Sequence, residues 1–207
     1  RIYLLRADGE SVPSDTLGSN AAEMEGVGSS GAKDRASIAF AWSLKALKLT
    51  IKIQDDIQYQ AAMGSGIWRG DSIQLAFDTD PDCEYPYNPL AGHLTKKITE
   101  FCVGHTVSGE QAWRHISHNE NELPLGDITG KIFCDWNRDE VAKLTTYEIS
   151  VPWQEVGVKN AMVGQKIGIA ILVNDLDGSE TTRKYYGLFD GIASEKSYRK
   201  FGQIILR

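Results

Sequence analysis

The sequence predicts an all-β protein, an antiparallel β-sandwich of jelly-roll type, from three observations. Apolar and polar residues alternate with a period of two in many short segments, as they do in strands that bury one face. Turns rich in Gly, Asp and Asn separate these segments, and no helical periodicity extends over ten or more residues. Short strands joined by turns are typical of an antiparallel sandwich rather than of βαβ units.

The N-terminal part is expected to hold one strand and an irregular arm. The strand is predicted at residues 2–5, and residues 8–34 are rich in Gly, Ser, Asp and Glu without any clear period. We assign residues 1–34 to this strand and arm and residues 35–207 to the sandwich. A length of 207 residues is compatible with a single domain that includes both parts.

The remaining strands follow in order along the chain. Residues 38–42 and 47–54 predict a hairpin, in which Trp42 shares the phase of the apolar residues and therefore belongs to the core. Two long segments that contain prolines, 79–98 and 116–127, are predicted to be loops. Further period-two segments predict strands at residues 72–78, 99–107, 111–115, 131–136, 145–151, 168–174, 183–189 and 203–206.

The strand at residues 72–78 has the most informative pattern. Ile73 and Leu75 lie in one phase and Gln74 in the other, so the apolar residues enter the core and Gln74 is presented on the opposite face. Trp68 precedes the turn that leads into this strand. A polar sheet face flanked by an aromatic side chain suits a sugar, because a pyranose offers both an apolar face and hydroxyl groups.

Charge and composition exclude some classes of function. The net charge of −6 repels phosphate backbones, so we expect no nucleic-acid partner. The longest apolar run, residues 167–173, is too short to span a bilayer, so we expect no membrane insertion. The chain begins at Arg1 without a signal-like segment, and we expect it to be a fragment of a larger multidomain polypeptide or a mature form whose targeting segment has been removed.

Carboxylates at alternate positions indicate a possible cation site. Asp78, Asp80 and Asp82 follow one another in a loop, and hard cations such as calcium prefer oxygen ligands of this kind. A solvated acidic turn is the favoured interpretation, and a structural calcium ion bound by these three residues is the alternative that we carry forward. The segment from Asp175 to Gly178 is a weaker second candidate, because Asp and Gly also form ordinary turns.

No catalytic motif is present, so an enzyme is not expected. The sequence lacks GxSxG, HExxH, GxxxxGK[ST] and a GxGxxG that follows a strand. A glycoside hydrolase or a lyase stays open as an alternative, because such enzymes need only a suitably spaced carboxylate pair and the chain has 28 Asp and Glu residues. A structural or protein-binding sandwich of a larger surface protein is the other alternative.

Five ordered segments carry a resemblance to a known family. The segments are residues 53–56, 68–75, 147–153, 173–178 and 201–202. In this order they resemble the family 9 carbohydrate-binding modules and their family-9-like relatives. The resemblance implies a β-sandwich that binds a polysaccharide chain end or an oligosaccharide without cleaving it. It also implies an extracellular or cell-surface location, an appended polysaccharide-degrading enzyme and, often, structural calcium.

The resemblance also implies which residues bind the sugar. Trp68 matches the first of two clamping Trp residues and Asn174 matches a binding Asn, whereas Gln74 and Cys102 replace an expected acidic and an expected basic residue. The second Trp has no clear counterpart. Together with the aromatic residues at strand ends, the resemblance gives a predicted ligand-binding set of Trp68, Gln74, Trp113, Arg114, Asn174, Tyr186 and Phe189. The related haem-binding sandwich domains, which need axial Met or His ligands, are a further alternative.

Overall fold

The computed structural model describes residues 2–5, 21–26, 36–83, 97–178, 184–193 and 196–207. Within them, no α-helix occurs, and the short helices are the 3-10 turns η2 (Gly64–Arg69), η4 (Trp153–Val156) and η5 (Tyr198–Lys200). None of these helices is long and apolar enough to cross a membrane. The strands are β1 (Ile2–Leu5), β2 (Ala21–Gly26), β3 (Ala36–Trp42), β4 (Ala46–Gln54), β5 (Ser72–Asp78), β6 (Ile98–Thr106), β7 (Gly109–Ile116), β8 (Gly126–Asp127), β9 (Phe133–Asp139), β10 (Leu144–Pro152), β11 (Lys166–Asp175), β12 (Lys184–Leu188) and β13 (Gly202–Leu206).

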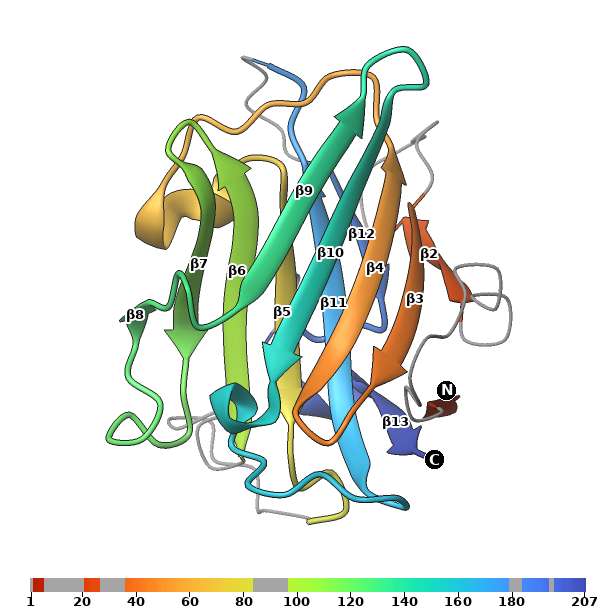
Figure 1. The fold of residues 1–207 in the computed structure, drawn as a ribbon, viewed down its shortest axis with the longest axis vertical. Coiled ribbons are helices and arrows are strands. Elements are labelled where there is room, and N and C mark those ends of the chain that lie inside the picture. Colours follow the sequence, from red (N-terminus) through yellow and green to blue (C-terminus); the bar gives the residue numbers. More distant parts are fainter. Residues whose placement is uncertain (1, 6–20, 27–35, 84–96, 179–183, 194–195) are drawn as a thin grey trace.

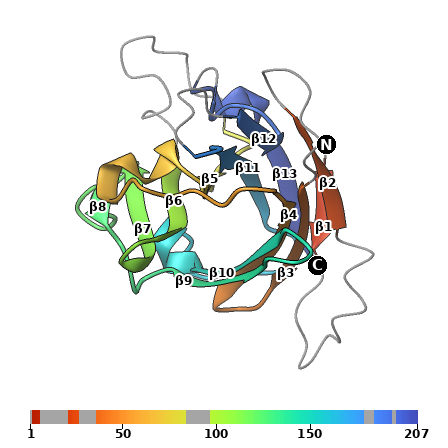
Figure 2. The same ribbon diagram turned by 90° about the horizontal axis from the view of Figure 1, so that it is seen from above.

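The strands form two layers around a common interior (Figures 1 and 2). One layer has the order β8-β7-β6-β5-β11-β12, with β13 also paired to β11, and the other has the order β2-β3-β4-β10-β9. A β12–β2 ladder connects the layers. Neighbouring strands are antiparallel except for the parallel pair β1–β13. The antiparallel β-sandwich predicted from the sequence is therefore confirmed.

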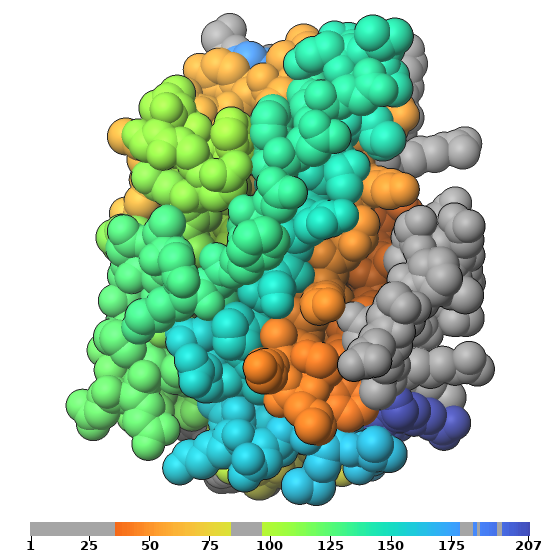
Figure 3. Space-filling model, in the orientation of Figure 1, coloured from red at the N-terminus to blue at the C-terminus, as the bar shows by residue number. Residues whose placement is uncertain are grey.

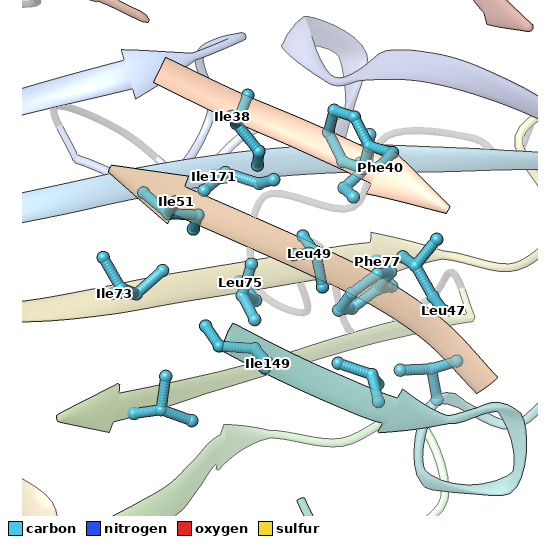
Figure 4. Close-up of a cluster of buried hydrophobic side chains, with 14 of the residues drawn as sticks. Ile38, Phe40, Leu47, Leu49, Ile51, Ile73, Leu75, Phe77, Ile149 and Ile171 are labelled. Carbon is cyan, nitrogen blue, oxygen red and sulfur yellow. The ribbon is translucent and has the colours of Figure 1, made fainter. Parts of the chain in front are cut away.

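The core lies between the layers and has the predicted strand phases. Leu49 and Ile51 of β4 face Ile73 and Leu75 of β5 across the interior (Figure 4), and all four are at most 1% exposed. The two flanking Lys residues of β4 point outward. Trp42 is 1% exposed, as its phase predicts. The alternation of side chains along each strand thus separates the apolar interior from the outer faces.

The N-terminal arm differs from the prediction. Residues 21–26 lie within the segment predicted to be irregular, yet they form β2. This strand pairs with β3 on one side and with β12 on the other. Its backbone hydrogen bonds therefore connect the two layers, which a pattern of side chains cannot reveal. The other residues of the predicted arm lie outside the described part of the chain.

Candidate functional site

The candidate site lies on the outer face of the layer that contains β5, β6 and β11. In the β5–β11 ladder Ser72 is opposite Asn174, and in the β5–β6 ladder Ala76 is opposite Glu100. Because residues opposite each other in a ladder share a face, Gln74 lies on the same face as Glu100 and Asn174. Three polar side chains from three adjacent strands thus meet on one sheet face.

A cavity of about 300 Å³ opens above these polar residues. The residues around it come from η2, three strands and the segment before η5, which brings together parts of the chain far apart in sequence. Trp68 is half-buried in the cavity wall, and the Arg69 guanidinium lies 5.4 Å from the centre of its ring. The residues that line the cavity include Trp68, Gln74, Glu100, His115, Ile192 and Lys196.

A chain of hydrogen bonds fixes the polar groups of the cavity. Lys196 Nζ donates to both carboxylate oxygens of Glu100, at 2.6 and 2.7 Å. Gln74 Nε2 donates to Glu100 Oε1 at 3.2 Å, and Asn174 Nδ2 donates to Gln74 Oε1 at 3.1 Å and to Ser72 Oγ at 3.0 Å. The buried members are held in one arrangement before any ligand arrives.

His115 adds an uncharged polar group to the wall. Burial, and then the positive charge of Lys196, lower the pKa of His115 from its ordinary value of 6.5. Its ring is therefore neutral at pH 7, so one nitrogen donates a hydrogen bond and the other accepts one. The Nε2 atom is buried and has no hydrogen-bond partner in the described part of the chain.

The structure brings only part of the predicted ligand-binding set to this cavity. Trp68 and Gln74 line it. Asn174 is 1% exposed and holds Gln74 from behind, so it positions the site rather than forming its wall. Trp113 shares the same sheet face through its pairing with Cys102, but its ring lies against Gly64 of η2.

The prediction that Arg114 binds a sugar is wrong. Arg114 lies opposite the core residue Phe101 and is 1% exposed. Its guanidinium donates to the carboxylate of Glu155 at 2.8 Å and to the Pro124 carbonyl at 3.1 Å. Because these partners enclose the charge between the layers, the side chain cannot reach the sheet face that carries the cavity.

The aromatic residues of β12 and the turn after it support the cavity indirectly. Phe189 is half-buried, with its ring directly against Gly202. With Tyr185, it packs against a small apolar cluster that includes the wall residue Ile192. The backbone of Tyr186 pairs with Val173, but its side chain lies outside the described part of the structure.

Sequence reasoning missed six wall residues, namely Glu100, His115, Ile116, Ile192, Ala193 and Lys196. The alternation of Glu100 with Phe101 is a usable signal, because it places Glu100 on the outer face of β6. The register that sets β6 beside β5 is not visible in the sequence. Lys196 lies outside any strand and reaches Glu100 across 96 positions of sequence, so no local pattern identifies it.

The predicted cation site at Asp78, Asp80 and Asp82 is not formed. Asp82 pairs with Lys166 at 2.9 Å and Asp80 with Lys97 at 3.7 Å, whereas the Oδ1 atom of Asp78 accepts a hydrogen bond from the Asp80 backbone N–H at 3.0 Å. Among the described residues, these three do not form a group of converging acidic side chains. Alternation along a loop does not make the side chains converge, because the backbone turns between them.

A different acidic cluster lies at one end of the sandwich. Carboxylate oxygens of Asp55, Asp56 and Asp177 lie within 4.8 Å of one another. Burial, together with the charges of Asp55 and Asp175, raises the pKa of neighbouring Asp71 to about 8, against the lowering effect of the backbone hydrogen bonds from Tyr59 and Leu176. Such a concentration of acidic groups favours either proton uptake or a bound cation.

An antiparallel sandwich with an indole ring beside fixed amide, carboxylate and ammonium groups has the features of a carbohydrate-binding module. The family described as "Carbohydrate family 9 binding domain-like" matches residues 15–207, and the chain belongs to this family. The resemblance seen in the sequence is thereby confirmed. Among curated protein sequences, none matches this chain.

Two solved structures show the same fold. One is a family 9 carbohydrate-binding module from Caldicellulosiruptor kristjanssonii in complex with glucose, with a TM-score of 0.70, 14% identity and coverage of 100% of this chain and 96% of that chain. The other is a family 9 module from the same organism in complex with cellotriose, with a TM-score of 0.68, 14% identity and coverage of 100% and 94%. At this identity the likeness concerns the fold.

Proposed function

We propose that this protein is a noncatalytic carbohydrate-binding module that holds the terminal residue of a polysaccharide or an oligosaccharide in the cavity beside Trp68. The observation that carries the proposal is the position of the Trp68 indole next to the fixed pair Glu100–Lys196. The indole covers the apolar C–H face of a pyranose, and the charged groups bind its hydroxyls. Family membership and the sugar complexes of the similar structures support the same function.

Glu100 and Lys196 supply the charges that the family pattern places elsewhere. Gln74 stands where an acidic residue is expected and Cys102 where a basic residue is expected, but Gln74 donates a hydrogen bond to Glu100, and Lys196 binds Glu100 on its solvent side. A carboxylate and an ammonium group are therefore present in the cavity from different positions of the chain. A cavity of about 300 Å³ is at the small end of ligand sites, which favours a chain end over a long internal segment.

The cavity favours binding over cleavage. Glycoside hydrolases use two carboxyl groups that flank the scissile bond, about 5–10 Å apart. Among the described residues that line the cavity, Glu100 is the single carboxylate. Lys196 and Gln74 both donate hydrogen bonds to this carboxylate. Neither partner is a carboxylic acid that could act as the second catalytic group.

Calorimetry with glucose and with cellotriose tests the proposal. We expect saturable binding that Glu100→Gln weakens, because the variant loses the charge that holds Lys196 and that accepts hydroxyl hydrogen bonds. Lys48→Ala, on the outer face of β4, serves as the matched control and should bind like the parent. The same protein incubated with a panel of polysaccharides should release no reducing ends and no unsaturated products. Binding that is indifferent to Glu100, or any such release, would overturn the proposal.

We also propose that calcium binds at Asp55, Asp56 and Asp177. Three converging carboxylates fit a hard cation. Lys184 binds the Oδ2 atom of Asp177 and Arg138 lies 3.6 Å from the Oδ2 atom of Asp55, but the buried Oδ1 atom of Asp177 has no hydrogen-bond partner among the described residues. Because a cation that binds only the folded state stabilises it, a chelator should lower the melting temperature. The chelator effect should vanish in Asp56→Asn and persist in Asp80→Asn. A melting curve of the parent that is unaffected by chelator would refute this site.

The family resemblance further supports an extracellular or cell-surface location and a place beside a glycan-degrading enzyme in a larger polypeptide. A binding module holds an attached catalytic domain close to its substrate and so raises the local substrate concentration. Fractionation of the producing cells, with an antibody against residues 36–207, tests the location. Recovery of the protein only from the cell interior would contradict it.

A further inference from the structure

A second cavity, of about 240 Å³, lies where the first residues of β7 meet the start of β9, and it shares no lining residue with the Trp68 cavity. β9 is the last strand at one end of the hydrogen-bonded order, and β7 is next to the last strand, β8, at the other end, yet β7 and β9 lie beside each other where the layers meet. Figure 1 shows β9 passing in front of β6 next to β7 and β8, and Figure 3 shows the surface of this side of the molecule. The cavity is bounded by Glu110, Gln111, Thr129, Gly130, Phe133 and Cys134.

Phe133 gives this cavity an exposed aromatic wall. Its side chain is 63% exposed, because it stands on the outer face of β9. The alternate residues on this face, Asp135 and Asn137, are polar, so an apolar ring is unusual there. Its partner in the neighbouring strand β10 is Ser150. A phenyl ring in this setting gains nothing from core packing, whereas it offers a flat apolar surface to the C–H face of a sugar ring.

The other walls supply partners for hydroxyl groups. Glu110 forms one hydrogen bond through Oε1 to His105 Nδ1, at 3.1 Å, and its side chain is 41% exposed. The Oε1 atom of Gln111 accepts a hydrogen bond from the Gly64 backbone N–H at 3.1 Å, which fixes the orientation of the amide. Thr129 is held by the Ala112 backbone N–H, at 3.1 Å. A carboxylate and a hydroxyl group thus stand at the cavity in fixed positions, whereas the amide of Gln111 is turned toward η2.

The charge of the cavity indicates the class of sugar. Within the described part of the chain, its lining includes the carboxylate of Glu110 and no Lys or Arg. Asp135 and Glu148 add negative charge on the adjoining surface, because they are opposite each other in the β9–β10 ladder and exposed. A uronic acid or a sulfated sugar would be repelled there, so the chemistry favours a neutral sugar.

We propose that this cavity is a second carbohydrate-binding site, which takes one neutral pyranose unit with Phe133 as its stacking surface. The two cavities have no lining residue in common, so each site binds without the other. A volume of about 240 Å³ lies below the range of roughly 300–1,000 Å³ for drug-sized ligands, which fits a single ring. Two weak sites on one module raise the avidity for a surface that displays many chains.

Nuclear magnetic resonance tests the second site by residue. Isotope-labelled protein is titrated with glucose, mannose, galactose, xylose and cellotriose, each to high millimolar concentration. We expect the backbone amides of Gly130 and Phe133 to shift in a saturable way with at least one of these sugars. The shifts should persist in Trp68→Ala, and Phe133→Ala should weaken this binding about tenfold, as expected for loss of a stacking aromatic.

Controls separate this proposal from that for the Trp68 cavity. The side-chain amide of Gln74 reports on the first cavity and should respond alike in the parent and in Phe133→Ala. Val141→Ala, at a position 96% exposed, is the control for a surface truncation. If Phe133→Ala proves unstable, Glu110→Gln tests the same site and should also weaken binding. The second site is overturned if Gly130 and Phe133 show no saturable shifts, or if these shifts are lost in Trp68→Ala. If the Gln74 side-chain amide alone shows no shift, the first site is overturned instead.

Discussion

Replacement of Trp68 by alanine is the sharpest perturbation of the proposed sugar site. Trp68 belongs to η2, outside the sheet, and is half-buried in the cavity wall, so its removal leaves the core intact. Sugar hydroxyls exchange hydrogen bonds with water for hydrogen bonds with the protein at a small net gain. Most of the affinity must then come from covering the apolar face of the ring. We expect Trp68→Ala to weaken binding by about 2 kcal/mol, or near thirtyfold.

Calorimetry with cellotriose measures the expected loss of affinity, and a denaturant titration measures the expected retention of stability. Trp68→Phe keeps a flat aromatic surface and should recover part of the lost affinity, which separates stacking from simple filling of space. The free energy of unfolding should change by less than about 1 kcal/mol, in contrast to Trp42→Ala in the core, which should cost about 3–5 kcal/mol. If Trp68→Ala binds cellotriose as tightly as the parent, the sugar lies elsewhere and the reasoning fails.

Three further predictions concern stability, measured as the free energy of unfolding in denaturant. Leu49→Ala should cost about 2–5 kcal/mol because Leu49 is 1% exposed, while the neighbouring Lys48→Ala should stay within about 0.5 kcal/mol; the reverse order would shift the register of β4 by one residue. Arg114→Ala should cost about 3–5 kcal/mol, because it leaves a carboxylate with a 10% exposed side chain without its 2.8 Å partner; a neutral result would contradict the buried ion pair. Gly202→Ala should cost about 1–3 kcal/mol, because the added Cβ would lie 2.1 Å from an aromatic ring, whereas Gly66→Ala meets only an ordinary 3.9 Å contact and should be tolerated.

The fold was predictable because strand patterns are local. Residues 72–78 alternate so regularly that the predicted strand and β5 coincide, and the β3–β4 hairpin follows from the same period. The strand β2 escaped prediction because its place is determined by backbone pairing to two other strands. Side-chain periodicity indicates which face of a strand is buried, but it does not indicate a strand that is held mainly by its backbone hydrogen bonds.

The site was predictable only in part because it depends on register and on distant segments. Gln74 was found through the phase of its own strand, but its partner Glu100 is 26 positions away. Arg114 was misplaced because it directly follows Trp113, and successive residues of a strand face opposite sides of the sheet; its phase is that of the buried Ala112. The register shift between Glu100 and Phe101 instead affects the next residues of β7, His115 and Ile116, which line the cavity. One irregular pair in a ladder moves every later side chain to the other face, and no pattern in β7 alone announces it.

The buried polar chain on this sheet face is difficult to explain by stability alone. Ser72, Gln74, Glu100 and Asn174 are each at most 6% exposed, although their neighbours on the same face are Ala76, Ala170 and Leu172. Well-packed apolar residues in place of such a network are often neutral or stabilising, by about 1–4 kcal/mol. A sandwich that needed only to be stable would extend the apolar cluster across this face. The network instead ends at Lys196, which is 40% exposed beside the cavity, so its buried end holds the carboxylate in place and its exposed end is accessible from the cavity. Preorganisation of this kind lowers the ordering cost that weak sugar binding must overcome.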